Sequence, residues 1–155
     1  MKFMYENLKL LNIEDIRAEL YDNVSKAVFK GDKVLLLKTL EDAKNTGITI
    51  DLSNEDGLYV VLAAKKGYKD LLETLCDYDT NLIRKYGSEM LSHAASHGQI
   101  ECVKFLLGSG ANPLELKGTT AYNNYEEVKV IFDDYIAEHE HEIKTTGDMI
   151  HTEVY

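Results

Sequence analysis

The feature that most constrains the fold is a pattern of small, glycine and apolar residues that occurs three times. The segments AVFKGDKVLLLKTL, AAKKGYKDLLETLC and AASHGQIECVKFLL align without gaps. In each, a small residue stands four positions before a glycine, and apolar pairs follow at helical spacing. The glycines recur at intervals of about 33 residues, a period typical of stacked repeat units; they are Gly31, Gly67 and Gly98.

Each part of this pattern has a physical reason to be there. The small residues allow a short first helix to pack closely on its neighbours. The glycine ends that helix, because it readily adopts a left-handed conformation. The apolar pairs form the buried stripe of a second helix. One such unit cannot bury its own apolar face, whereas stacked units can. We therefore expect an all-α chain of stacked helix-turn-helix units.

One segment carries a specific resemblance. Residues 87–114, GSEMLSHAASHGQIECVKFLLGSGANPL, resemble an ankyrin repeat in the first helix (HAASHG), the second helix (ECVKFLL) and the closing turn (GSGANP). The units around Gly67 and Gly31 are weaker matches, and a fourth unit lacks about six residues of its first helix. The resemblance implies an ankyrin-repeat solenoid with N- and C-terminal cap helices.

We expect residues 1–155 to form a single ankyrin-repeat domain. An N-terminal cap helix is predicted at residues 5–20, with Asn12 as a possible N-cap. An acidic extension is predicted at residues 137–155, and the residues after Ile143 are expected to be a frayed or loosely docked tail. The four repeats are predicted at about 22–52, 53–82, 83–114 and 115–136.

The charge of the chain limits its partners. Lys and Arg number 17 and Asp and Glu 27, so the net charge is −10. Nucleic acids and anionic membranes repel such a surface, whereas a basic protein does not. No apolar run reaches the roughly 18 residues of a membrane span, and no secretory signal is evident. We expect a cytoplasmic monomer acting in a heteromeric complex, with no small-molecule substrate.

Two histidine clusters in the sequence contain residue types that bind metal ions. His93 and His97 are four residues apart, but the repeat register places His93 inward and His97 at a variable position. In EHEHE, residues 138–142, His139 and His141 are two apart and face away from each other on a helix. We therefore expect no cofactor, and the two cysteines, Cys76 and Cys102, are predicted to be buried free thiols.

No phosphate-binding loop or nucleophile turn is present, so catalysis is not expected. The resemblance implies instead that partners bind at the hairpin tips and at variable positions of the first helices. Tyr86 and Arg84 are the favoured hot spots, because Tyr and Arg dominate binding energies. The candidate residues are Phe29, Lys30, Asn54, Glu55, Asp56, Lys65, Lys66, Arg84, Lys85, Tyr86, Ser88, Ser96 and His97, with Glu115 and Lys117 at a further tip.

The predicted function is that of a non-catalytic protein-protein interaction module. Small size and negative charge suit an acidic inhibitor or immunity protein that neutralises one basic partner such as a toxin. An adaptor or a host-directed effector is the alternative within the same class. A metal-dependent enzyme using the C-terminal His/Glu cluster is the alternative of another class.

Overall fold

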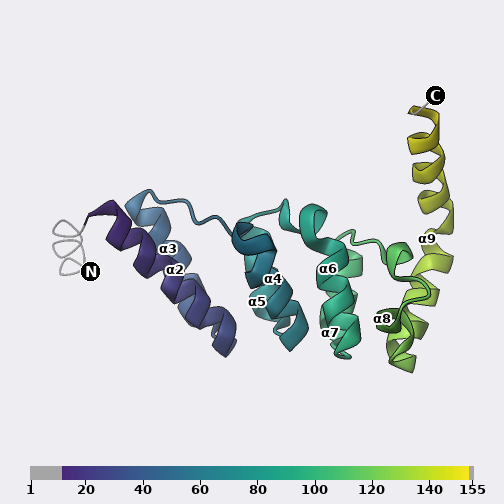
Figure 1. The fold of residues 1–155 in the computed structure, drawn as a ribbon, viewed down its shortest axis with the longest axis horizontal. Helices are drawn as coiled ribbons and strands as arrows, with labels where there is room; N and C mark the ends of the chain where they lie inside the picture. The colour runs from purple at the N-terminus through teal and green to yellow at the C-terminus, as the bar shows by residue number, and fades with distance from the viewer. Residues whose placement is uncertain (1–11, 154–155) are drawn as a thin grey trace.

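The computed structural model describes the backbone of residues 12–153 and the side chains of residues 12–139. Figure 1 shows helix pairs lying side by side in chain order, with the described chain beginning at one end of the row and ending at the other. The elements are α2 (Ile13–Lys30), α3 (Lys33–Thr46), α4 (Asn54–Lys66), α5 (Lys69–Tyr78), α6 (Leu82–Ser96), α7 (Ile100–Gly108), the 3₁₀ helix η1 (Pro113–Leu116), α8 (Thr120–Asn123) and α9 (Glu126–Glu153).

The predicted all-α stack of helix-turn-helix units is confirmed. Helix α2 packs on α3 within one unit, and first helices pack on one another across units, α2 on α4 and α4 on α6. The small residues allow this close approach, since Ala63, Ala64, Ala94 and Ala95 are fully buried. Among residues 12–153, no helix has both the length and the apolar content needed to cross a membrane.

The first helix differs from the prediction. Residues 1–11 lie outside the described part of the chain, and α2 runs unbroken from Ile13 to Lys30. The expected boundary near residues 20–22 between a cap helix and the first repeat is therefore wrong. The stretch contains no Gly or Pro, and the buried stripe of Ile16, Leu20 and Val24 continues across it at helical spacing. Asn12 is the N-cap, since its side chain accepts a hydrogen bond from the Asp15 N–H (2.8 Å).

The C-terminal unit is only partly as expected. Its first helix is reduced to the four residues of α8, in line with the predicted truncation. Residues after Ile143, predicted to be a frayed or loosely docked tail, continue α9 as a helix to Glu153 and extend past the row of helices (Figure 1). No proline interrupts this segment, and helical backbone hydrogen bonds close within the segment itself.

Each repeat glycine is covered by a side chain from the next unit. Tyr68 lies over Gly31, Gln99 over Gly67 and Tyr125 over Gly98. A Cβ atom on Gly31 would lie 2.8 Å from Cε1 of Tyr68, and one on Gly98 would lie 3.1 Å from Cε1 of Tyr125. The glycines therefore have two structural roles. They adopt the left-handed turn, with φ of 70° at Gly31, and they leave room for the neighbouring unit.

This double role predicts different costs for two glycines that cap helices in the same way. Gly31 and Gly47 have φ of 70° and 76°, but only Gly31 has a neighbour within 4 Å of an added Cβ. Gly47→Ala is expected to lower the free energy of unfolding by about 1 kcal/mol, for the left-handed conformation alone. Gly31→Ala is expected to cost about 2 to 4 kcal/mol, because Tyr68 must also move. Urea unfolding measures both.

The same two substitutions in a Tyr68→Ala background provide the control. With the ring removed, Gly31→Ala is expected to cost no more than Gly47→Ala. Equal costs of the two substitutions in the wild-type background would contradict the contact between units.

Cys76 and Cys102 are free thiols buried in the core, as the sequence predicts. Burial raises the pKa of Cys76 from 9.0 to about 12, and the nearby carboxylates of Asp77 and Asp79 add to the effect. Burial likewise raises the pKa of Cys102 from 9.0 to about 11. Since the thiolate is the nucleophile, both thiols are held in their unreactive form.

These shifts predict a loss of stability at alkaline pH. Above pH 9.0 the unfolded chain releases thiol protons that the folded chain retains, so stability falls as the pH rises toward about 11 to 12. The loss is expected to be at most about 1.4 kcal/mol per pH unit for each thiol. Urea unfolding across this range should show a shallower fall for Cys76→Ala/Cys102→Ala. Equal falls for the variant and the wild type would disprove the assignment.

Candidate functional site

The first helices expose one face across three successive units. We call this face the first-helix stripe and define it by the residues two, five and nine positions before each repeat glycine. These positions are one helical turn apart, so they lie on one side of each helix. All nine side chains are exposed or half-buried, and they are Asp22, Lys26, Phe29, Leu58, Leu62, Lys65, Glu89, His93 and Ser96.

The predicted site residues fall into two groups at opposite ends of the first helices. One group lies at their C-terminal ends: Phe29, Lys30, Lys65, Lys66, Ser96 and His97. The other lies at the N-terminal ends of α4 and α6: Asn54, Glu55, Asp56, Arg84, Lys85, Tyr86 and Ser88. A 13-residue helix such as α4 separates its ends by about 18 Å. The predicted residues therefore do not form one compact patch.

The residues that join the two groups were missed by sequence reasoning. They are Leu58 and Leu62 on α4 and His93 on α6, all in the middle of the stripe. A search one and two helical turns before the variable positions would have found them, since these positions share a helix face. Apart from the hairpin tips, sequence reasoning considered only the two residues directly before each glycine.

The prediction that His93 packs inward is wrong. His93 is exposed, while Leu91, Ala94 and Ala95 fill the buried side of α6. His97 is also exposed, and its Nδ1–H donates to the carbonyl oxygen of His93 (2.9 Å). The His97 ring thus caps the last turn of α6.

The predicted residues at the C-terminal ends of the first helices are held in place by contacts between units. Lys66 Nζ donates a hydrogen bond to the carbonyl oxygen of Phe29 (3.1 Å), and it lies 5.5 Å from the centroid of the Phe29 ring. In the next unit, Gln99 Nε2 donates to the carbonyl oxygen of Lys65 (3.0 Å). Both bonds satisfy carbonyl groups that a helix end leaves without a partner. The structure thereby brings together Phe29 and Lys66.

The tip residue Tyr86, a predicted hot spot, makes internal contacts. Its hydroxyl donates to the carbonyl oxygen of Ser53 (3.1 Å), and its ring covers Gly57, where an added Cβ would lie 2.8 Å from Tyr86 Cγ. The side chain is half-buried, whereas the flanking Arg84 and Lys85 are exposed. Tyr86 therefore holds α6 against the preceding tip.

Two further tyrosines hold the long loop that precedes α4. The hydroxyl of Tyr21 accepts a hydrogen bond from the Asp51 N–H (2.7 Å), and the hydroxyl of Tyr78 accepts one from the Ile50 N–H (3.1 Å). This loop contains the extra residues of the first repeat. Side chains from α2, α5 and α6 therefore supply hydrogen bonds that the loop cannot make itself.

The backbone at this tip is strained. Glu55 and Asp56 have φ of 53° and 56°, and Gly57 follows with φ of 74°. A left-handed conformation costs a non-glycine residue roughly 1–2 kcal/mol. Both carboxylates are exposed. The contact of Tyr86 with Gly57 and Ser53 fixes the conformation that projects them.

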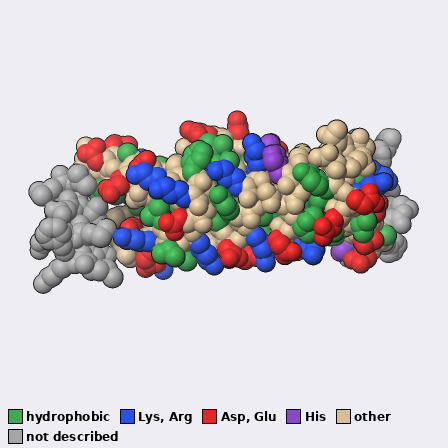
Figure 2. Space-filling view, turned by 90° about the horizontal axis from the view of Figure 1, so that it is seen from below, with side chains coloured by type: hydrophobic (Ala, Val, Ile, Leu, Met, Phe, Trp, Pro, Cys, Tyr) green, Lys and Arg blue, Asp and Glu red, His purple; other side chains and the backbone are tan. Residues whose placement is uncertain are grey.

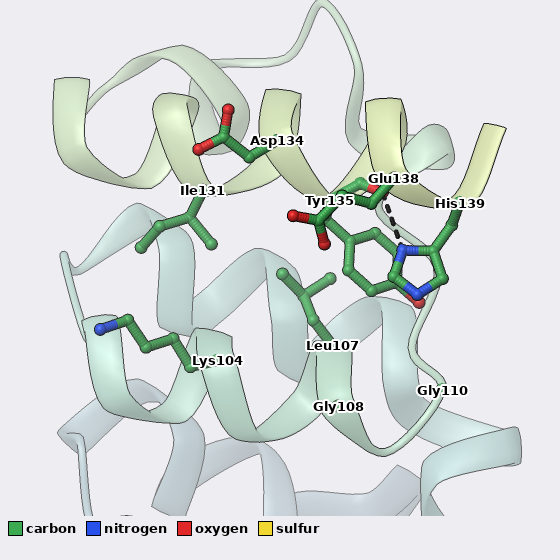
Figure 3. A pocket seen from close by; sticks show the side chains of 9 residues that line it. All are labelled: Lys104, Leu107, Gly108, Gly110, Ile131, Asp134, Tyr135, Glu138 and His139. Carbon is green, nitrogen blue, oxygen red and sulfur yellow. Dashed lines mark hydrogen bonds between the residues drawn. The ribbon is translucent and has the colours of Figure 1, made fainter.

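A separate groove of about 540 Å³ lies between α7 and α9. Figure 3 shows Lys104 and Leu107 on the α7 side, facing Ile131, Tyr135 and His139 of α9. The His139 ring stacks on Tyr135, with centroids 4.1 Å apart, and its Nδ1–H donates to the Tyr135 carbonyl oxygen (2.9 Å).

The C-terminal His/Glu cluster is only partly described, because the side chain of His141 lies outside the described residues. Glu138 and His139 both line the groove between α7 and α9. Among the side chains that the structure does describe, no three His, Cys, Asp or Glu residues lie close enough to hold a metal ion together.

Comparison with known proteins agrees with the repeat organisation. A family model of ankyrin repeats in three copies matches residues 25–117. The match contains the three repeat glycines and all of the first-helix stripe except Asp22. No solved structure matches the chain.

The internal role of Tyr86 predicts a loss of stability when its hydroxyl is removed. Tyr86→Phe is expected to lower the free energy of unfolding by about 1 kcal/mol, the usual net contribution of one hydrogen bond. Tyr125→Phe is the matched control, because Tyr125 covers Gly98 in the same way. Within the described residues, the hydroxyls of five other tyrosines make hydrogen bonds, but that of Tyr125 makes none. Thermal or urea unfolding measures both, and equal stability of the two variants would contradict the role.

Proposed function

The chain belongs to the ankyrin-repeat family, and on that premise we propose that it is a non-catalytic module that binds a partner protein across the first-helix stripe. Ankyrin repeats are protein-protein interaction modules. The observation that carries the proposal is the exposure of the same three register positions in three successive repeats. Repetition on a rigid stack gives an extended, preformed surface of the kind that repeat proteins use for binding.

The chemistry of the stripe supports this proposal. Phe29 is 56% exposed and Leu58 is 41% exposed, and charged or polar side chains flank both. An apolar centre within a polar rim is typical of protein interfaces. Phe29 is also held by Lys66, so less conformational freedom is lost when a partner covers it.

The finer proposals concern the partner. An inhibitor of one basic protein, such as an immunity protein bound to a toxin, is supported by the net charge of −10. Exposed acidic residues of α9, among them Asp133, Asp134 and Glu138, suit such a partner. The candidate residues near the repeat glycines do not, because Lys30, Lys65 and Lys66 would repel it. An adaptor or host-directed effector would use the same stripe.

A cytoplasmic location belongs to the same proposal. The two buried free thiols support it, since a reducing compartment keeps cysteines unpaired. A metal-dependent enzyme built on the C-terminal histidines has weaker support, because the described ring of His139 is engaged with Tyr135.

The test is affinity purification from the native cell with the wild type and two variants. Phe29→Ala/Leu58→Ala/Lys65→Ala removes two exposed apolar side chains and one lysine from the stripe, and its expected result is at least a tenfold loss of the recovered partner. Such a loss corresponds to about 1.4 kcal/mol, within the range for interface truncation. Quantitative mass spectrometry measures the recovery.

The matched control, Lys38→Ala/Glu41→Ala/Lys44→Ala, changes three exposed residues of the second helix α3. It should retain the partner, and circular dichroism should show both variants folded. Recovery of the same partner by the stripe variant and by the wild type would disprove the proposed surface.

A further inference from the structure

We propose that the partner presents an acidic, extended peptide segment to the C-terminal ends of the first helices, with carboxylates about three residues apart. This inference rests on the proposed function and specifies the chemistry of the partner. The receiving residues are Lys30, Lys65 and Lys66, directly before the glycines of the first two repeats. We call these three lysines the turn cations.

The turn cations stand out against the charge of the whole chain. The net charge is −10, yet these three lysines are all exposed at two successive turns, and His97 occupies the equivalent position in the third repeat. Figure 2 views the face at which the first helices end, and Lys and Arg side chains recur along it together with histidine. Favourable interaction with the helix dipole explains a cation at a helix end. It does not require the same turn position to carry Lys or His in all three repeats.

Within the described part of the chain, these lysines also lack acidic partners. Elsewhere, Lys26, Lys69 and Lys104 form ion pairs with carboxylates one helical turn away. Among the described side chains, no carboxylate lies within ion-pairing distance of Lys30, Lys65 or Lys66. Asp32, next to Gly31, is engaged as the N-cap of α3, where it accepts the Leu35 N–H (3.0 Å). These ammonium groups are free to bind external carboxylates.

The Lys66 side chain is already held in one position by contacts within the chain. One of its N–H groups bonds to the Phe29 carbonyl oxygen (3.1 Å), and the rings of Phe29 and Tyr68 lie 5.5 and 6.0 Å from Nζ. An ammonium group has three N–H donors, so further donors are left for a ligand. Because these contacts already restrict the side chain, binding a carboxylate there costs less entropy than binding at a freely moving lysine.

The distance between neighbouring repeats determines how far apart the carboxylates of the ligand must lie. Neighbouring packed helices are about 10 Å apart, and an extended chain advances about 3.3 Å per residue. A carboxylate at every third residue of an extended segment therefore meets successive turn cations. Phe29 is exposed and its carbonyl oxygen is bonded to Lys66, so its ring can receive an intervening side chain. A nucleic acid fits less well, because the net charge of −10 repels a polyanion.

The test measures binding of labelled synthetic peptides to the full chain by fluorescence anisotropy. The probe repeats Glu-Gly-Ser four times, and a second peptide of the same composition has its four Glu residues in one block. We expect the spaced peptide to bind more tightly, and its affinity to fall as salt rises. An oligothymidylate of similar charge is the nucleic-acid arm.

Two variants with equal net charge provide the matched comparison. Lys30→Glu/Lys65→Glu reverses two turn cations whose ammonium groups make no ion pair among the described residues, and Lys38→Glu/Lys44→Glu reverses two exposed lysines of α3. We expect at least a tenfold loss of peptide affinity for the first and less than a twofold change for the second. Thermal unfolding checks that both are folded.

Three results would overturn the inference. They are no binding of either acidic peptide, equal losses in the two variants, and tighter binding of the oligothymidylate than of the spaced peptide. The proposed function fails separately. If the stripe variant loses its cellular partner while no acidic peptide binds, the binding surface stands and only its ligand chemistry is wrong.

Discussion

The structure depends on the contact between each repeat glycine and the side chain that covers it from the next unit. Tyr68 on Gly31, Gln99 on Gly67 and Tyr125 on Gly98 bring the ends of neighbouring first helices together. A single repeat cannot bury its own apolar face, so the stack forms only if units approach closely. Any side chain at these glycines would hold the units apart as well as strain the turn.

The same contact positions the surface that we assign to binding. Because successive first helices meet at equivalent turns, residues at equivalent register positions lie in rows across the stack. Lys66 illustrates the coupling, since it bonds to the Phe29 carbonyl oxygen of the preceding unit and remains exposed to solvent. One side chain thus contributes both to the stacking of the array and to the proposed ligand surface.

The net charge of the chain and the local charge at its turns favour partners of opposite charge. Taken over the whole chain, the excess of Asp and Glu favours a basic partner. Taken over the turns, the clustering of Lys30, Lys65 and Lys66 favours an acidic one. Local complementarity governs which surfaces come into contact, whereas net charge mainly governs approach over longer distances. The turn cations are therefore the better guide to the bound segment.

The sequence by itself determined the repeat period, the helical class and the glycine turns, because these follow from local spacing and backbone preference. It also placed Asn12 at a helix start and Cys76 and Cys102 in the core. Only the tertiary structure decided that His93 faces solvent, that Tyr86 is used for stacking and that Lys66 meets Phe29. These outcomes depend on contacts between residues more than thirty positions apart or on which helix face the neighbouring unit covers, and spacing along one chain segment does not encode them.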